Sequence, residues 1–137
     1  MIQRIQTLYL LGSGVLLALF VVLQDQWAPI VAAVQPWLGT LVLVLSIITA
    51  LAALLAIGLY KNRALQARVV SAAQWLDLLT VAGVLTGLFM AMRGGQTLPS
   101  GATLIAIAPL VAYLMLRLAR RGILGDIQTV RSMDRIR

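Results

Sequence analysis

The residue that could most clearly take part in chemistry is Asp77, an acid that falls inside a long apolar segment. An ionisable side chain within a membrane helix is a candidate proton or cation site, because a charge in lipid is costly and is kept for a reason. Asp77 follows Trp75 by two positions, which is only ~3 Å along a helix, so we expect it near a membrane boundary. The favoured interpretation is structural, with Asp77 in a first helical turn and paired with Arg68 or Arg117.

Little else in the sequence could support catalysis. The chain contains no Cys, no His and no Glu, and Asp supplies all four acidic residues. Disulfides, thiol nucleophiles, Cys/His zinc sites, haem-ligating His and imidazole acid–base chemistry are therefore excluded. Catalysis usually needs at least two convergent titratable groups, and Asp77 with a nearby Arg is the one such combination. The sequence predicts a protein that is not an enzyme, with no cofactor and no bound metal.

The elements that must position Asp77 are helices in a membrane. Of the 137 residues, 61% are hydrophobic and 11% are charged, whereas soluble domains carry about 25% charged residues. Four apolar segments, at about 5–23, 37–60, 75–92 and 101–118, approach the ~20 residues that a helix needs to cross a bilayer. Backbone groups in lipid must be bonded internally. We expect an all-α, integral membrane four-helix bundle in a single domain, 1–137, with the first span retained rather than cleaved as a signal peptide.

The basic residues predict the orientation of this bundle. Ten of the eleven Lys and Arg residues lie in the N-terminus, between the second and third spans, or at and beyond the end of the fourth span. The two opposite loops hold only Arg93. Since cytoplasmic segments are enriched in Lys and Arg, both termini should be cytoplasmic, in a multi-pass protein of a bacterial inner membrane. The net charge of +7 then favours anionic lipids of the cytoplasmic leaflet as partners, and no nucleic acid.

Small residues form two stripes within the spans. Gly83, Gly87 and Ala91 follow one another at four-residue spacing in the third span, and Gly14 and Ala18 do so in the first. Such stripes let two helix backbones approach closely. Such stripes pack the four helices against one another, which is the interpretation that we favour, or they pack this chain against another chain. The possibility of a homo-oligomer therefore stays open.

The cytoplasmic tail, 119–137, is expected to form a short separate helix. Gly122 and Gly125 should separate it from the fourth span. Ile123, Ile127 and Val130 are spaced i, i+4 and i+7, which indicates one apolar edge of a helix. Near the end of this helix an acid should pair with arginines three positions away on either side; these residues are Asp134, Arg131 and Arg137.

Three cytoplasmic segments carry a resemblance to a known family. They are residues 1–7 (MIQRIQT), 60–66 (YKNRALQ) and 126–137 (DIQTVRSMDRIR). With these segments the chain resembles an uncharacterised family of short four-span membrane proteins of Bacteroidota, known as a domain of unknown function. The resemblance implies an inner-membrane protein and brings no catalytic residues. The family's tail is richer in Lys and Glu, and Arg120, Gly125 and Ile127 depart from that pattern.

The contrast between generic spans and a distinctive basic face favours docking. We expect a non-enzymatic accessory or assembly subunit of an inner-membrane complex that binds a larger membrane protein complex or lipid through this face. The expected docking residues are Arg4, Lys61, Arg63, Val130, Arg131, Asp134, Arg135 and Arg137. The alternative is a small homo-oligomeric transporter or channel that uses Asp77, although a transporter usually has more polar residues at the middle of the membrane.

Overall fold

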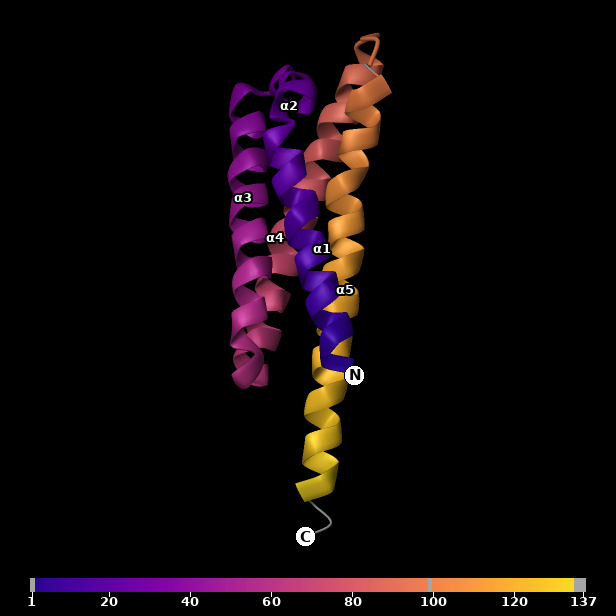
Figure 1. Ribbon diagram of the computed structural model, residues 1–137. Coiled ribbons are helices and arrows are strands. Elements are labelled where there is room, and N and C mark those ends of the chain that lie inside the picture. The colour runs from indigo at the N-terminus through magenta and orange to yellow at the C-terminus, as the bar shows by residue number, and fades with distance from the viewer. Residues whose placement is uncertain (1, 99, 135–137) are drawn as a thin grey trace.

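The protein is an elongated bundle of antiparallel helices (Figure 1). The structure, a computed structural model, describes the backbone of residues 2–98 and 100–134 and the side chains of residues 5–98, 101–130 and 132. The helices are α1 (Ile2–Val22), α2 (Gln24–Ala32), α3 (Pro36–Gly58), α4 (Arg63–Arg93) and α5 (Ser100–Asp134), and a short 3-10 turn, η1 (Leu59–Lys61), joins α3 to α4. Over these described residues the chain forms helices and no strands, so the all-α prediction is confirmed.

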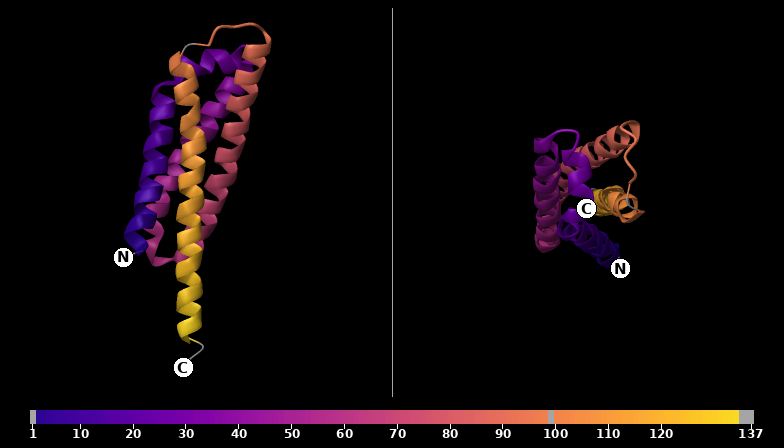
Figure 2. Two further views of the ribbon diagram at one scale, coloured as in Figure 1. Left: turned by 90° about the vertical axis from the view of Figure 1, so that its right-hand side faces the viewer. Right: turned by 90° about the horizontal axis from the view of Figure 1, so that it is seen from above.

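The four long helices form a ring in which every neighbour is antiparallel. α1 packs against α3 and α5, and α4 packs against the same two helices from the other side, as the view from above in Figure 2 shows. The start of α1, η1 and the end of α5 therefore lie at one end of the bundle, which we call the basic end. Each of the four helices is long and apolar enough to cross a membrane. The chain is accordingly a multi-pass membrane protein by length and composition.

The short helix α2 closes the opposite end of the bundle. Trp27 of α2 stacks on Phe20 of α1 with ring centroids 4.3 Å apart, and its indole N–H donates to the Phe20 carbonyl at 2.8 Å. That carbonyl belongs to the last turn of α1, where carbonyls lack partners within the helix. Trp27 is 1% exposed, so its side chain belongs to the core at this end of the bundle.

The contact between α4 and its neighbours depends on glycine. A Cβ atom at Gly83 would lie 2.6 Å from Val42 Cγ2 in α3, and one at Gly87 would lie 2.7 Å from Val31 Cγ2 and 3.0 Å from Val31 Cα in α2. Both distances are shorter than carbon atoms tolerate, so the helices could not come this close with a larger residue. This stripe faces the interior of the same chain, and Ala91 at its end is buried as well.

The C-terminal tail is not a separate helix, and the predicted break at Gly122 and Gly125 was wrong. α5 runs without interruption for 35 residues, which is ~50 Å at ~1.5 Å per residue. A glycine within a helix costs only about 1 kcal/mol. Packing outweighs this cost here, because Ile123 is 1% exposed and Ile127 packs against the same core cluster. Of the predicted apolar edge, only Val130 is exposed.

Replacing Gly87 with alanine tests the close contact of α4 with α2. The new Cβ would meet the backbone of Val31, so we expect Gly87→Ala to destabilise the bundle by about 1–3 kcal/mol. Thermal unfolding of the full chain in a mild detergent measures the effect. Gly58→Ala is the control, because a Cβ at Gly58 meets nothing within 4 Å. An unfolding temperature for Gly87→Ala equal to that of Gly58→Ala would contradict the packing described.

Candidate functional site: the basic end of the bundle

Two local hydrogen bonds position the start of α4 at the basic end. The side chain of Asn62 caps the helix, with its Oδ1 accepting from the Leu65 backbone N–H at 3.1 Å. The buried Gln66 then reaches across to α3, where its Nε2 donates to the Ala56 carbonyl at 2.9 Å. This carbonyl lies near the end of α3, so one side chain both satisfies it and ties α4 to α3. The turn from α3 to α4 is thus fixed, and Arg63 is fixed with it.

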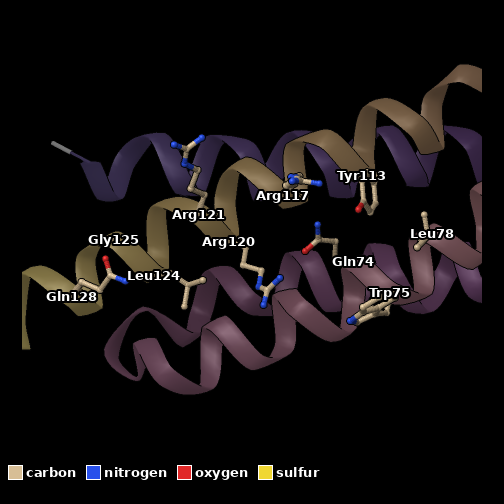
Figure 3. A pocket seen from close by; sticks show the side chains of 10 residues that line it. All are labelled: Gln74, Trp75, Leu78, Tyr113, Arg117, Arg120, Arg121, Leu124, Gly125 and Gln128. Carbon is tan, nitrogen blue, oxygen red and sulfur yellow. The ribbon is translucent and has the colours of Figure 1, made fainter.

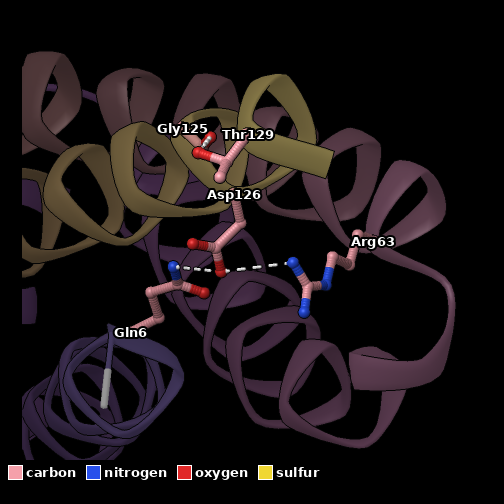
Figure 4. A network of polar contacts seen from close by, with 5 residues as sticks. All are labelled: Gln6, Arg63, Gly125, Asp126 and Thr129. Atoms are coloured by element: carbon pink, nitrogen blue, oxygen red, sulfur yellow. Dashed lines mark hydrogen bonds and ion pairs between the residues drawn. The ribbon is translucent and has the colours of Figure 1, made fainter. Parts of the chain in front are cut away.

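Asp126 joins three helices at this end (Figure 4). Its Oδ2 accepts a hydrogen bond from Gln6 Nε2 of α1 at 3.0 Å and lies 3.6 Å from Arg63 Nη1 of α4. Gly122, one turn earlier in α5, leaves room for this arrangement, because a Cβ there would lie 2.9 Å from Gln6 Cγ. We call these three side chains the Asp126 brace. It was not predicted from the sequence; the available signal was an acid within an otherwise basic tail.

Beyond the Asp126 brace, α5 projects from the bundle as a single helix (Figures 1 and 2). Gln128, Thr129 and Val130 are exposed on this projection, and Val130 is 48% exposed. A helix with no neighbour on any side presents its whole circumference to the surroundings. This part of α5 is therefore the most accessible element of the basic end.

The predicted docking residues are in different situations. Lys61 is exposed, with its ammonium 6.0 Å from the centre of the Tyr60 ring. Arg63 is 34% exposed and is paired with Asp126, so it is not a free surface charge. The remaining five lie outside the residues whose side chains the structure describes, and with them the predicted ion pairs of the tail; they are Arg4, Arg131, Asp134, Arg135 and Arg137.

A groove runs along the outside of the bundle between α4 and α5 (Figure 3). Its volume is about 670 Å³. One face of α5 and one turn of α4 line it, with Gln74, Trp75, Leu78, Tyr113, Arg117, Arg120, Arg121, Leu124, Gly125 and Gln128. In Figure 3, Arg120 extends from α5 toward α4, and Gln74 extends from α4 toward α5. We call this feature the α4–α5 groove.

Asp77 lies in the interior of the bundle and near the middle of α4, not in a first helical turn as predicted. The Gln66–Ala56 hydrogen bond and the Gly83–Val42 contact fix how α3 and α4 pair. Interpolation between them places Asp77 level with residues 46–49, half-way along α3. Asp77 is 0% exposed, so its carboxylate lies in the interior of the bundle.

The predicted pairing of Asp77 with an arginine was also wrong. Both carboxyl oxygens of Asp77 lack a hydrogen-bond partner among the described residues, and so does Oε1 of Gln74 one turn away. Arg68 is exposed, and Arg117 lines the α4–α5 groove. Arg63 and Asp126 form the one ion pair that the described residues contain. Asp77 is therefore kept apart from these arginines by the way the helices pack.

The hydroxyl groups near this depth do not serve Asp77 either. Ser46 donates to the Val42 carbonyl at 2.7 Å, Thr49 donates to the Leu45 carbonyl at 2.8 Å, and Thr80 donates to the Leu76 carbonyl at 3.2 Å. A hydroxyl has one proton to donate, so each is committed to its own helix. No group of three metal-ligating side chains occurs within the described part of the chain.

The shorter stripe of small residues in α1 is divided between the inside and the outside of the bundle. Gly14 is buried against α3, where a Cβ atom would lie 2.8 Å from Leu54 Cδ2. Ala18, one turn later, is exposed. Gly14 therefore serves packing within the chain, and Ala18 does not take part in that contact.

Comparison with known proteins gives a family and no activity. A family described as "Domain of unknown function (DUF4293)" matches residues 2–136. Because this match covers nearly the whole chain, the protein belongs to that family. Neither a curated protein nor a solved structure matches the chain. The site must therefore be interpreted from its own geometry.

Replacing Asp126 with alanine tests the Asp126 brace. The change removes a hydrogen bond to a charged group, worth about 1.5–3 kcal/mol, and a half-exposed ion pair worth about 0–1 kcal/mol. We expect faster amide hydrogen exchange at the start of α1 and in α5 beyond Gly122, measured by mass spectrometry. Asp25→Ala is the matched control, since Asp25 is an exposed acid at the opposite end. Unchanged exchange in these two segments would show that Asp126 does not hold them together.

Proposed function

We propose that this protein is a non-enzymatic accessory or assembly subunit of a bacterial inner-membrane complex and docks through its basic end. The observation that carries the proposal is the projecting end of α5, which the Asp126 brace holds rigidly outside the bundle. Within this proposal both termini face the cytoplasm, because the basic residues gather at that end. We also propose that the family occurs in Bacteroidota.

The physical support is that the two parts of α5 have different surroundings. Its first part packs in the bundle, and Ile123 and Ile127 anchor it to the core. In its last part the described side chains of Gln128, Thr129, Val130 and Ser132 are exposed. A helix that exposes few apolar groups is tolerated without a partner. When a partner covers Val130 and its neighbours, the burial contributes favourable free energy of binding. An anchored and therefore preorganised helix loses less conformational entropy on binding than a disordered tail.

A truncation tests docking without disturbing the bundle. Ending the chain after Thr129 removes most of the projecting helix and leaves Asp126 with its partners. We expect a stoichiometric larger membrane protein to co-purify with the full chain in mild detergent at native expression level and to be lost from the truncated chain. Mass spectrometry of the eluate identifies the partner.

The control replaces Arg68 with glutamine, which removes charge at the same end outside the expected docking residues and leaves α5 intact. If truncation left the co-purifying proteins, the growth and the localisation of the protein unchanged, docking through α5 would be wrong. A homo-oligomer with no partner would also contradict the proposal and would favour the second candidate function.

The second candidate is a small homo-oligomeric transporter or channel. One observation favours it: Asp77 is fully buried at the middle of the bundle, and its two carboxyl oxygens have no hydrogen-bond partner within the described residues. A buried, unpaired acid in a membrane protein is expensive and is characteristic of proton and cation pathways. The groove residue Gln74, one turn from Asp77, lies between it and the basic end.

Asp77→Asn tests this candidate. The change keeps the shape of the side chain and removes the ionisable group, so proton or cation flux through reconstituted vesicles should fall to the level of empty vesicles. A pH-sensitive or cation-sensitive dye inside the vesicles measures the flux. Asp25→Asn is the matched control because Asp25 is exposed on α2. Equal flux in the wild type and both variants would eliminate a role for Asp77 in transport.

A further inference from the structure

The α4–α5 groove carries positive charge that the protein does not neutralise. Arg117, Arg120 and Arg121 line it, and no acidic residue does. Nearby, Asp126 is engaged by Gln6 and Arg63. None of the three arginines takes part in an ion pair within the described part of the chain.

The spacing of these arginines makes the charge costly. Arg117 is three and four residues from Arg120 and Arg121, and like charges at this spacing repel each other on a helix surface. Arginine also presents a planar fork of donors that matches the oxygens of a phosphate group. A phosphate held by Arg117 and Arg120 would reduce the repulsion and satisfy donors of both side chains, whereas Arg121 extends away from Arg120 (Figure 3).

The groove changes from polar to apolar along its length. The arginines lie toward the basic end, whereas Tyr113 of α5 and Leu78 of α4 lie further into the bundle (Figure 3). Tyr113 precedes Arg121 by eight residues, or ~12 Å along the helix. Trp75 is 65% exposed beside them, and Trp and Tyr prefer the boundary between headgroups and hydrocarbon. A ligand that fits has a charged head and an apolar chain.

Gln74 provides an independent indication of a ligand. This side chain is 8% exposed and extends from α4 into the groove, yet its Oε1 has no hydrogen-bond partner among the described residues (Figure 3). A buried acceptor without a donor costs about 1–3 kcal/mol. A hydroxyl group of a ligand headgroup would supply that donor. Arginine forks, a hydroxyl acceptor and an apolar wall together describe a phospholipid with a hydroxylated, anionic headgroup.

We propose that the α4–α5 groove binds one anionic phospholipid, with its phosphate held by Arg117 and Arg120 and its acyl chain over Trp75 and Leu78. The headgroup hydroxyl donates to Gln74. This site shares only Gln128 with the projecting end of α5 and does not depend on the proposed docking function. The lipid fills the gap between α4 and α5 and neutralises the basic face where it meets the membrane.

Native mass spectrometry of the full chain in a neutral detergent tests this site. The probes are phosphatidylglycerol, phosphatidylcholine with the same acyl chains, and inorganic phosphate. We expect one phosphatidylglycerol per chain, at least tenfold weaker binding of phosphatidylcholine, and no displacement of the bound lipid by millimolar phosphate. This comparison uses the wild-type chain and needs no variant.

Two matched double variants locate the site. Arg117→Gln with Arg120→Gln should weaken phosphatidylglycerol binding about 25-fold, at about fivefold for each basic residue. Lys61→Gln with Arg68→Gln removes the same charge at the same end but outside the groove, and should change binding less than about threefold, because only screened, longer-range attraction is lost. Unfolding temperatures in lipid-free detergent check that both variants are folded.

Three results would overturn the proposal. Equal binding of phosphatidylcholine and phosphatidylglycerol would show that the groove does not recognise the negative charge. Equal loss in the two double variants would show a diffuse basic surface rather than a built site. Displacement of the lipid by inorganic phosphate would identify a free phosphate site instead of a lipid site.

Discussion

Helices in a membrane gain little from the hydrophobic effect when they associate, because lipid is as apolar as the side chains that it replaces. Their association depends on close contact, and in this protein that contact centres on α4. Gly83 and Gly87 allow α4 to touch Val42 and Val31, and Gln66 ties its start to α3. Because α4 packs against α2, α3 and α5, its placement constrains the depth of the residues in those three helices.

The basic end shows how one acid divides a set of positive charges into two groups. Asp126 engages Arg63 and Gln6 and thereby joins α1, α4 and α5. The arginines on the α4 side of α5 receive no such partner within the described residues. The first group serves the fold, and the second is available to the surroundings. The same acid also determines where α5 leaves the bundle, so packing and exposure on this helix have a common origin.

The candidate site was only partly predictable, and Asp77 shows why. From the sequence, Asp77 stood out as an acid among apolar residues, and its depth in the membrane was estimated from its distance to Trp75. α4 begins at Arg63, twelve residues before Trp75, so the helix extends well beyond the apolar segment on which that estimate relied. The contact between Gln6 and Asp126 could not be predicted from the sequence either, because these residues are 120 positions apart in the chain. Contacts between distant segments depend on how the helices pair, which local patterns do not contain.

Composition and local patterns were enough to predict the helical class, the existence of four long apolar helices and the gathering of basic residues between and after them. These properties follow from composition and from the need to satisfy backbone groups in lipid, which act on each segment alone. Only the folded chain shows that α5 continues through Gly122 and Gly125, that Trp27 is buried, and that Asp77 lies deep in the bundle with no hydrogen-bond partner among the described residues. The reason is physical: Ile123, Phe20 and residues 46–49 of α3 surround these positions only after the chain has folded, and burial by such neighbours outweighs local preference.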